Sequence, residues 1–397
     1  MISFKKVKQM NKKKLLVTAS TFPRWEGDTE PSFILDLCQA LSEYLDITVL
    51  VPAAPGAKAQ EVIGSIKIMR YHYFPIHKCE TLCYPGAIVP RIKEKKSRAL
   101  LVPFLFIALF CNLRKLIPQF DLIHANWLIP QGIVQACFDK PYVITGLGGD
   151  VTSLNIPIVR NLKLKCLQRA KHITVISESL NEYIQKIYPN NKTSVISMGY
   201  DGKVFNTEKR IQNYFGQNEK KVVLFVGRLV EKKGLTYLIE AVKELDDVKL
   251  IVVGNGPLEE ELRRQALLQG EKIQFVGSKK HEELAPLYAS ADIFVVPSVT
   301  AQNGDKEGLP TTIVEAMASG VPIIATRHSG IPELVRDGVN GYLVDEKDVE
   351  SLRKAIKNLL DSQDTRELFI KNGLETVKEK EYKKIAERYY KIFEELN

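Results

Sequence analysis

The feature that most constrains the fold is a regular alternation in the second half of the chain. Short apolar runs are separated by stretches with helical spacing, and the runs are residues 222–226, 249–253, 273–276, 293–296 and 322–325. Buried strands that alternate with amphipathic helices are typical of a parallel sheet covered on both faces. The pattern therefore predicts a doubly wound α/β domain of the Rossmann type.

The first half repeats this pattern less regularly. A helix with Pro31 near its start lies between the first two of its apolar runs, which are residues 15–19, 47–51, 122–124, 142–145 and 173–176. A polar stretch at 203–221 reads as a linker, and 397 residues suffice for two domains with separate cores. The last segment, Tyr382 to Leu396, has the spacing of an amphipathic helix.

Residues 307–320 combine features of a ligand site. Glu307 and Glu315 lie eight residues apart, before and inside a helix in which Pro310 suits the first position. Gly320 should end that helix. The amides of Gly308 to Thr312 would lie at the positive end of its dipole, where they can bind phosphate while the carboxylates accept bonds from sugar hydroxyls. For an isolated pair of acids, solvated surface charges would be the better interpretation.

Two further loops follow strands of the same domain. One contains Gly227, Arg228 and Lys233, and the other contains Asn255 and Gly256. Ligands of open parallel sheets bind at the carboxyl ends of the strands, so these loops and the 307–320 segment should converge. Arginine offers a fork for phosphate oxygens and lysine a point charge. A diphosphate could be held there without a metal, although two isolated cations would more simply be solvated.

The charge is unevenly distributed along the chain. The net charge is +9, and residues 1–200 hold 26 Lys and Arg against 14 Asp and Glu. A basic first half suggests an anionic partner such as a membrane surface, nucleic acid or a phosphorylated acceptor. Nucleic acid is the weaker alternative, because no basic motif with interleaved aromatic residues is present.

An apolar stretch from Ala99 to Cys111 is flanked by Lys and Arg on both sides. It is shorter than the roughly 20 residues that span a bilayer. A buried helix of the first domain is the simpler interpretation, and a segment resting on an anionic membrane surface is the alternative.

The six cysteines show no paired spacing, and no secretory signal precedes Lys12, which predicts a reducing, cytoplasmic location. His72, His77, Cys79 and Cys83 cluster in sequence, but their spacing fits no standard zinc pattern, so no metal is expected.

Taken together, the motifs resemble those of glycosyltransferase family 4, which has the GT-B fold and retains anomeric configuration. The resemblance rests on Gly227 to Gly234, Val253 to Pro257, Ala291 to Ser298, Glu307 to Gly320 and Ser329 to Glu333, and more loosely on Phe22 to Asp28, His124 to Trp127 and Met198 to Asp201. It implies two Rossmann-like domains facing across a cleft: an acceptor-side domain at 1–205, a donor domain at 206–375, and a final helix at 376–397 returning to the first domain.

The resemblance also implies roles for individual residues. Arg228 and Lys233 would neutralise the donor diphosphate, Glu307 would contact the transferred sugar, and Glu315 would bind the ribose. Further donor contacts are expected from Gly227, Asn255, Gly256, Gly308, Leu309, Pro310 and Thr311.

First-domain residues of the cleft would be Arg24, Gly27, Gly148 and Asp150. Leu147 stands where many relatives have histidine, so His124 is the candidate replacement as a catalytic residue, with a structural histidine as the alternative. Gly27 is single where many relatives have a glycine pair, so Arg24 is a candidate to help hold phosphate.

The expected activity is retaining transfer of a hexose from a UDP- or GDP-sugar to a glycan or lipid-linked acceptor, without a metal or other cofactor, in surface polysaccharide or glycolipid synthesis. No Asp-x-Asp metal motif occurs. The enzyme is expected in the cytoplasm, at the inner face of the membrane, and not on nucleic acid. The alternatives are a GT-B sugar-nucleotide epimerase and a catalytically silent scaffold of a polysaccharide assembly complex.

Overall fold

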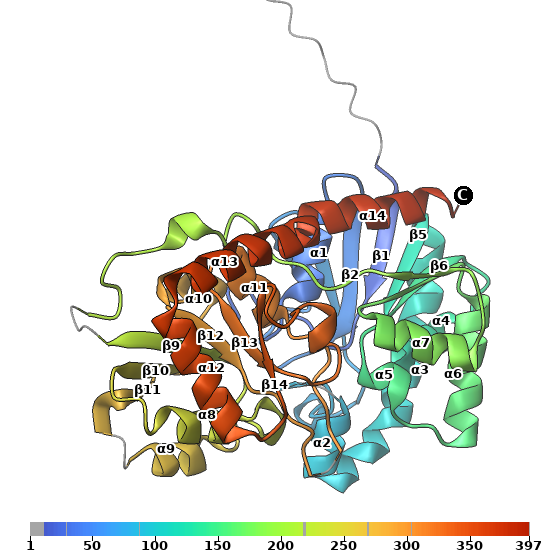
Figure 1. Ribbon diagram of the computed structural model, residues 1–397. Helices are drawn as coiled ribbons and strands as arrows, with labels where there is room; N and C mark the ends of the chain where they lie inside the picture. The colour runs from blue at the N-terminus through green and yellow to red at the C-terminus, as the bar shows by residue number, and fades with distance from the viewer. Residues whose placement is uncertain are drawn as a thin grey trace, which may run out of the picture.

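The computed structural model describes residues 12–28, 30–86, 88–216, 220–267, 270–302 and 304–396. These residues form two α/β domains, each built on one sheet with helices on both faces (Figure 1). The predicted fold class is confirmed.

The sheet of the first domain has the strand order β3-β4-β2-β1-β5-β6-β7-β8, and its strands are parallel except for β3, which pairs antiparallel with β4. The strands are β1 (Lys14–Thr18), β2 (Asp46–Pro52), β3 (Gln60–Ile63), β4 (Ile66–Tyr71), β5 (Leu122–Asn126), β6 (Tyr142–Gly146), β7 (His172–Val175) and β8 (Thr193–Val195). The helices are α1 (Phe33–Leu41), α2 (Ile88–Glu94), α3 (Val102–Leu116), α4 (Ile133–Gln135), α5 (Gly149–Thr152), α6 (Pro157–Arg169) and α7 (Glu178–Ile187).

The sheet of the second domain is wholly parallel, in the order β11-β10-β9-β12-β13-β14. The strands are β9 (Lys221–Val226), β10 (Val248–Val253), β11 (Ile273–Phe275), β12 (Ile293–Val296), β13 (Ile323–Thr326) and β14 (Gly341–Val344). The helices are α8 (Leu235–Val242), α9 (Glu259–Leu267), α10 (His281–Ser290), α11 (Thr311–Ala318), α12 (Val349–Asp361) and α13 (Gln363–Val377).

Each sheet separates two apolar cores. In β1, Leu15 and Val17 pack on the side of α1, whereas Leu16 packs on the side of α3. This alternation follows from the period of two in a strand, and burial on both faces is why the central strands are continuous apolar runs. The predicted strands all lie within two residues of observed ones.

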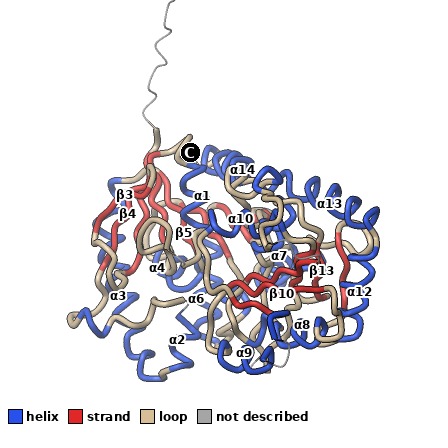
Figure 2. Tube along the Cα trace, turned by 90° about the vertical axis from the view of Figure 1, so that its left-hand side faces the viewer, coloured by secondary structure: helices blue, strands red, loops and turns tan. Residues whose placement is uncertain are grey.

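The last helix, α14 (Tyr382–Glu394), crosses from the second domain back to the first and contacts α1 (Figures 1 and 2). Its buried residues, including Ile385, Tyr389 and Phe393, join the first-domain core. The two crossings of the chain between the domains are paired, because Tyr200 N–H donates to the Lys380 carbonyl and Tyr382 N–H donates to the Tyr200 carbonyl. The expected return of the final helix is confirmed.

The apolar stretch 99–111 falls in a 3₁₀ turn, η2 (Lys96–Leu101), and in α3. Pro103 is the second residue of α3, where its missing N–H costs nothing, so it does not interrupt the helix. Leu105, Leu109 and Leu113 are buried, as expected for a first-domain helix, but other apolar residues of α3 are exposed.

Candidate active site

The site begins with loops at the carboxyl ends of β9, β10 and β12. Gly234 has a left-handed backbone, and a Cβ there would overlap the carbonyl oxygen of Pro297. Gly254 also has positive φ, and a Cβ on it would overlap the Gly227 carbonyl. The loops are held together by hydrogen bonds as well, since Leu229 N–H donates to the Asn255 carbonyl over 2.9 Å. The glycines therefore allow the loops to lie in direct contact.

Lys233 and Glu307 meet in this cluster. Lys233 Nζ lies 2.8 Å from Glu307 Oε2, and both side chains are largely buried. Burial alone would raise the pKa of Glu307, but the charges of Lys233 and Lys232 outweigh it, so the pKa is lowered. Lys232 points elsewhere, with Nζ 3.3 Å from Asp305 Oδ2. Glu307 is therefore an ionised carboxylate that orients one ammonium group.

Two residues that the sequence analysis did not select fix the backbone of Glu307. Its N–H donates to His328 Nε2 over 3.0 Å, and His328 Nδ1 lies 2.6 Å from Glu346 Oε1. Glu346 also accepts from the N–H of Thr300 over 2.7 Å. Because Nε2 accepts a hydrogen bond, the ring proton is assigned to Nδ1 and donates to Glu346. The one feature of the sequence that could have pointed to His328 is its position directly before Ser329 to Glu333, a segment on which the family resemblance rests.

Glu315 lies inside α11 and is buried. Tyr288 Oη donates to its Oε2 over 3.2 Å. Burial raises the pKa of Glu315, while the charge of His281 and the hydrogen bonds of Tyr288 and Thr311 partly offset this rise. A buried carboxylate with free lone pairs can accept hydrogen bonds from ligand hydroxyls.

The helix α11 begins at Thr311, so Pro310 is its N-cap residue and the prediction of Pro310 at the first helical position was wrong by one residue. Pro310 is extended, with ψ at 122°, which excludes it from the helix. Within the described chain no side chain caps α11. Ile313 N–H donates to the Pro310 carbonyl over 3.2 Å, so the amides of Thr311 and Thr312 are those that remain for a ligand beside Gly308 and Leu309. Gly320 has φ of +73° and ends the helix, as predicted.

These loops face the first domain. A Cβ on Gly308 would lie 3.9 Å from Ile176 Cδ1, and one on Gly86 would lie 3.7 Å from Arg228 Nη1. Glu333 bridges the domains, because its carboxylate accepts the N–H groups of Glu178 and Ser179 at the start of α7, over 2.7 and 3.1 Å. Gly227, Arg228, Lys233, Asn255, Gly256, Glu307 and the start of α11 thus lie on the side of the second domain that faces the first.

The first-domain loop that was expected to hold phosphate is arranged differently. Arg24 makes a two-pronged pair with Asp28, with Nε at 2.9 Å and Nη2 at 2.7 Å, and its guanidinium lies over the Trp25 ring. The hydrogen bond to Asp28 raises the pKa of Arg24. Its charge is already paired within the loop, which weakens its candidacy as a phosphate ligand. Gly27 instead faces Lys280 of the second domain, whose Nζ would lie 3.2 Å from a Cβ there.

The catalytic role considered for His124 is not supported. His124 is 1% exposed in β5, with Nε2 2.7 Å from Thr145 Oγ1 and its ring against Tyr389 and Phe393 of α14. Burial lowers the pKa of His124 to about 3. The histidine is therefore a neutral core residue beneath the final helix, which corresponds to the structural alternative.

Asp150 supports the first-domain loops rather than projecting from them. Its carboxylate accepts the N–H groups of Leu128 over 2.8 Å and Leu147 over 3.1 Å. Gly148 has positive φ, and a Cβ on it would meet open space. The backbone at Gly148 can therefore approach a ligand, while Asp150 fixes the backbone at Leu128 and Leu147.

The cluster of His72, His77 and Cys79 forms local contacts. His72 Nδ1 lies 2.6 Å from Glu80 Oε2, and the rings of His72 and His77 are stacked with centroids 3.5 Å apart. Among the described residues, no group of three or more His, Cys, Asp and Glu side chains is placed to hold a metal.

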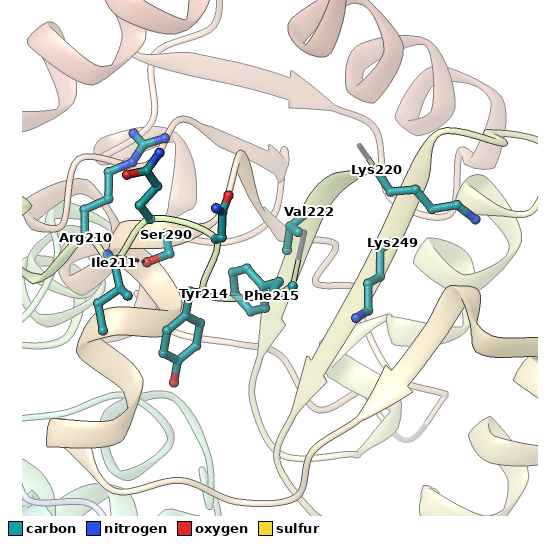
Figure 3. Close-up of a pocket in the computed structure, with 11 residues that line it drawn as sticks. Arg210, Ile211, Tyr214, Phe215, Lys220, Val222, Lys249 and Ser290 are labelled. Carbon is teal, nitrogen blue, oxygen red and sulfur yellow. Dashed lines mark hydrogen bonds between the residues drawn. The ribbon is translucent and has the colours of Figure 1, made fainter. Parts of the chain in front are cut away.

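One cavity lies away from these loops. A cavity of about 490 Å³ is bordered by the interdomain linker and the start of β9, with Arg210, Tyr214, Phe215, Val222, Lys249 and Ser290 among its lining residues (Figure 3). Residues 217–219, next to it in the chain, lie outside the described residues. None of the candidate donor residues lines it.

Two facing Rossmann-like domains with such a site define the GT-B class of glycosyltransferases. The family model for glycosyl transferases group 1 matches residues 206–376, and the model for glycosyltransferase family 4 matches residues 32–203. The chain belongs to this group 1/family 4 of glycosyltransferases.

Similarity to individual proteins agrees with this membership. The chain is 37% identical over 178 residues to the amylovoran biosynthesis glycosyltransferase AmsK of Erwinia amylovora, covering 43% of this chain and 42% of AmsK. It is 33% identical over 225 residues to a GDP-mannose-dependent phosphatidylinositol monomannoside mannosyltransferase of Mycolicibacterium smegmatis, covering 54% and 59% of the two chains. These matches thus span about half the length of the relatives.

Solved structures share the whole fold. Sucrose-phosphate synthase of Thermosynechococcus elongatus superposes with a TM-score of 0.77 at 22% identity, over 97% of this chain and 99% of that one. HepE of Anabaena, in complex with UDP and glucose, superposes with a TM-score of 0.72 at 19% identity, over 96% and 99%.

Proposed function

We propose that this glycosyltransferase moves a hexose from a UDP- or GDP-sugar to a glycan or lipid-linked acceptor during synthesis of a surface polysaccharide or glycolipid. The observation that carries the proposal is the meeting of the Lys233–Glu307 pair with the uncapped start of α11, opposite the first domain. Cation, carboxylate and free amides together suit a ligand that contains both a diphosphate and sugar hydroxyls.

The relatives support this choice of donor and acceptor class. HepE is described in complex with UDP and glucose, and the M. smegmatis enzyme is described as GDP-mannose-dependent. Both descriptions name a hexose or a hexosyl nucleotide. AmsK is described as acting in amylovoran biosynthesis, and the M. smegmatis enzyme as acting on a phosphatidylinositol mannoside, which supports glycan and lipid-linked acceptors.

The geometry suggests how the donor bond is broken. Lys233 forms an ion pair with Glu307 at 2.8 Å, and because an ammonium group has three protons it can donate to diphosphate oxygens as well. Arg228 and the first-turn amides of α11 provide further positive potential. As the bond between the anomeric carbon and the phosphate oxygen breaks, negative charge develops on the diphosphate, and preorganised donors stabilise that charge.

The acceptor oxygen then bonds to the anomeric carbon from the same face, and its proton passes to the departing phosphate oxygen. This route retains configuration, and NMR of the product anomer tests it.

We further propose that cations and amides of the chain make a divalent metal unnecessary. Activity that persists in EDTA would agree with this, and complete loss would contradict it.

The activity itself is tested by incubating the protein with UDP-glucose, UDP-galactose or GDP-mannose, with and without a lipid extract, and measuring released nucleoside diphosphate by chromatography. We expect acceptor-dependent release from one donor. Glu307→Gln should reduce it about 100-fold, and the exposed control Glu350→Gln should not. Isomerised sugar nucleotide without release would indicate an epimerase, and no reaction with any donor would favour a scaffold.

A further inference from the structure

The region around α3 has two apolar faces. One face packs into the first-domain core through Leu105, Leu109 and Leu113. The other is open to solvent, with exposed fractions of 74% for Leu100, 43% for Phe104 and 62% for Ile107. Leu100 lies at the end of η2, and Phe104 and Ile107 lie in α3 three residues apart, as one side of a helix requires; the three residues are here called the α3 outer face. A helix at the protein surface that only covers the core would need apolar residues on one side alone.

Neighbouring segments extend this apolar surface. The ring of Phe104 meets Phe74 edge-on at 4.9 Å, and Ile76 beyond it is exposed. At α6, which contacts α4 as α3 does, Ile156 and Ile158 are exposed as well. Both views place α2, α3 and α6 at the same end of the first domain (Figures 1 and 2). The contact between Phe104 and Phe74 makes the α3 outer face part of a larger exposed apolar surface, and such surfaces mark interaction sites.

Positive charge borders the α3 outer face. Lys93, Lys95 and Lys96 are exposed just before it, and Arg114 and Lys115 are exposed at the far end of α3. The acid in this segment, Glu94, is already paired with Arg91 and Arg98, at 2.6 and 2.9 Å, so it does not neutralise the lysines. An apolar stripe bordered by lysines is complementary to a layer with anionic head groups above acyl chains.

We propose that the first domain binds the cytoplasmic leaflet of an anionic membrane, with the α3 outer face in the interface and Lys93, Lys95 and Lys96 at the lipid phosphates. A second copy of the chain fits less well, because two such faces would bring like-charged lysines together. The stretch Lys96–Gln119 is long and apolar enough to cross a membrane by length and composition. However, the inner face of α3 is packed in the first-domain core. We therefore place α3 on the membrane surface and not across the bilayer.

The test is co-sedimentation of the full chain with vesicles of phosphatidylcholine alone or with added phosphatidylglycerol. We expect binding to the anionic vesicles that weakens with salt. Leu100→Ser and Ile107→Ser should each weaken it about tenfold, the loss expected when one buried aliphatic side chain is removed from the interface. Replacing Lys93, Lys95 and Lys96 by Gln should abolish the preference for anionic lipid.

The matched control is Leu267→Ser, because Leu267 of α9 is 73% exposed but belongs to the second domain. This variant should bind like the wild type. Absence of vesicle binding, equal binding to neutral vesicles, or equal losses in Leu267→Ser and Leu100→Ser would overturn the proposal. A dimer in analytical ultracentrifugation that Ile107→Ser dissociates would instead identify a second copy as the occupant. Release of nucleoside diphosphate by the Leu100→Ser, Ile107→Ser and Leu267→Ser variants tests the active site separately from vesicle binding.

Discussion

Glu307 is fixed from two sides, which explains how one carboxylate can hold a defined position in a loop. Its side chain pairs with Lys233, and its backbone N–H is bound by His328, which Glu346 orients in turn. Because the ring nitrogen that accepts the Glu307 N–H must lack a proton, the Glu346 carboxylate also selects the tautomer. His328 is therefore a positioning residue for Glu307.

Replacing His328 by Ala should release the loop that carries Glu307. A displacement of about 1 Å at a catalytic group can cost on the order of 100-fold in rate, so we expect kcat to fall by roughly 10- to 100-fold, with a smaller change in the KM of the donor. Steady-state kinetics measures this. The exposed histidine variant His77→Ala should keep wild-type rates, and unchanged kcat in His328→Ala would show that the His328 contact has no positioning role.

Single residues also show where sequence reasoning succeeds and fails. Lys233 and Glu307 were selected from two motifs that are well separated in the sequence, and the fold brings Lys233 Nζ within 2.8 Å of Glu307 Oε2. His328 was not selected, because its role depends on Glu346, which comes from the loop after a strand the sequence did not reveal. For His124 the sequence left a catalytic and a structural role open, because nothing near it in sequence shows that Tyr389 and Phe393 cover it. Both outcomes depend on contacts between residues far apart in the sequence.

At the scale of elements, the donor loops depend on contact between backbones. Gly234→Ala would place a Cβ against the Pro297 carbonyl on a left-handed residue. We expect a loss of roughly 3 kcal/mol in the free energy of unfolding, because strain and overlap add. Gly338 also has positive φ but borders open space, so Gly338→Ala should cost only about 1 kcal/mol. Thermal denaturation of both variants distinguishes them, and equal losses would contradict this explanation.

Most of the buried strands were predictable from the sequence, although β4 and β14, which are also largely buried, were not predicted. Central strands such as β9 and β12 are buried on both faces and were identified within a residue. The edge strand β3 is mostly exposed, and β8 has only three partly buried residues, so neither stands out as an apolar run. Both were missed. The start of α11 was misplaced by one residue, because proline is compatible with both the N-cap and the first helical position.

At the scale of the whole molecule, Asp36 of α1 lies where the domains meet. Ser32 donates to its carboxylate over 2.7 Å, and Asp36 feels the charges of His281, Asp201 and Glu315. Burial raises the pKa of Asp36 to about 6. The ordinary value of about 3.9 applies in the unfolded chain, so the folded protein binds this proton more tightly. Its contribution to stability therefore increases as the pH falls from 7 towards 4.

Asp36→Asn should remove the cost of the buried charge. We expect the variant to be more stable than the wild type at pH 7.5 by about 1 to 3 kcal/mol, with a difference that shrinks as the pH approaches 4. Thermal melts across this range measure it. A variant that is less stable at pH 7.5, or a difference that does not change with pH, would contradict the role assigned to Asp36.

The central claim, that Lys233 and the start of α11 hold a nucleoside diphosphate, is tested most directly by calorimetric titration of UDP and GDP in EDTA. Lys232 provides the control, because it adjoins Lys233 in sequence but is directed to Asp305. We predict that the wild type binds one nucleotide, that Lys233→Gln weakens binding at least about tenfold, and that Lys232→Gln changes it less than about threefold. No binding by the wild type, or equal losses in both variants, would contradict the claim.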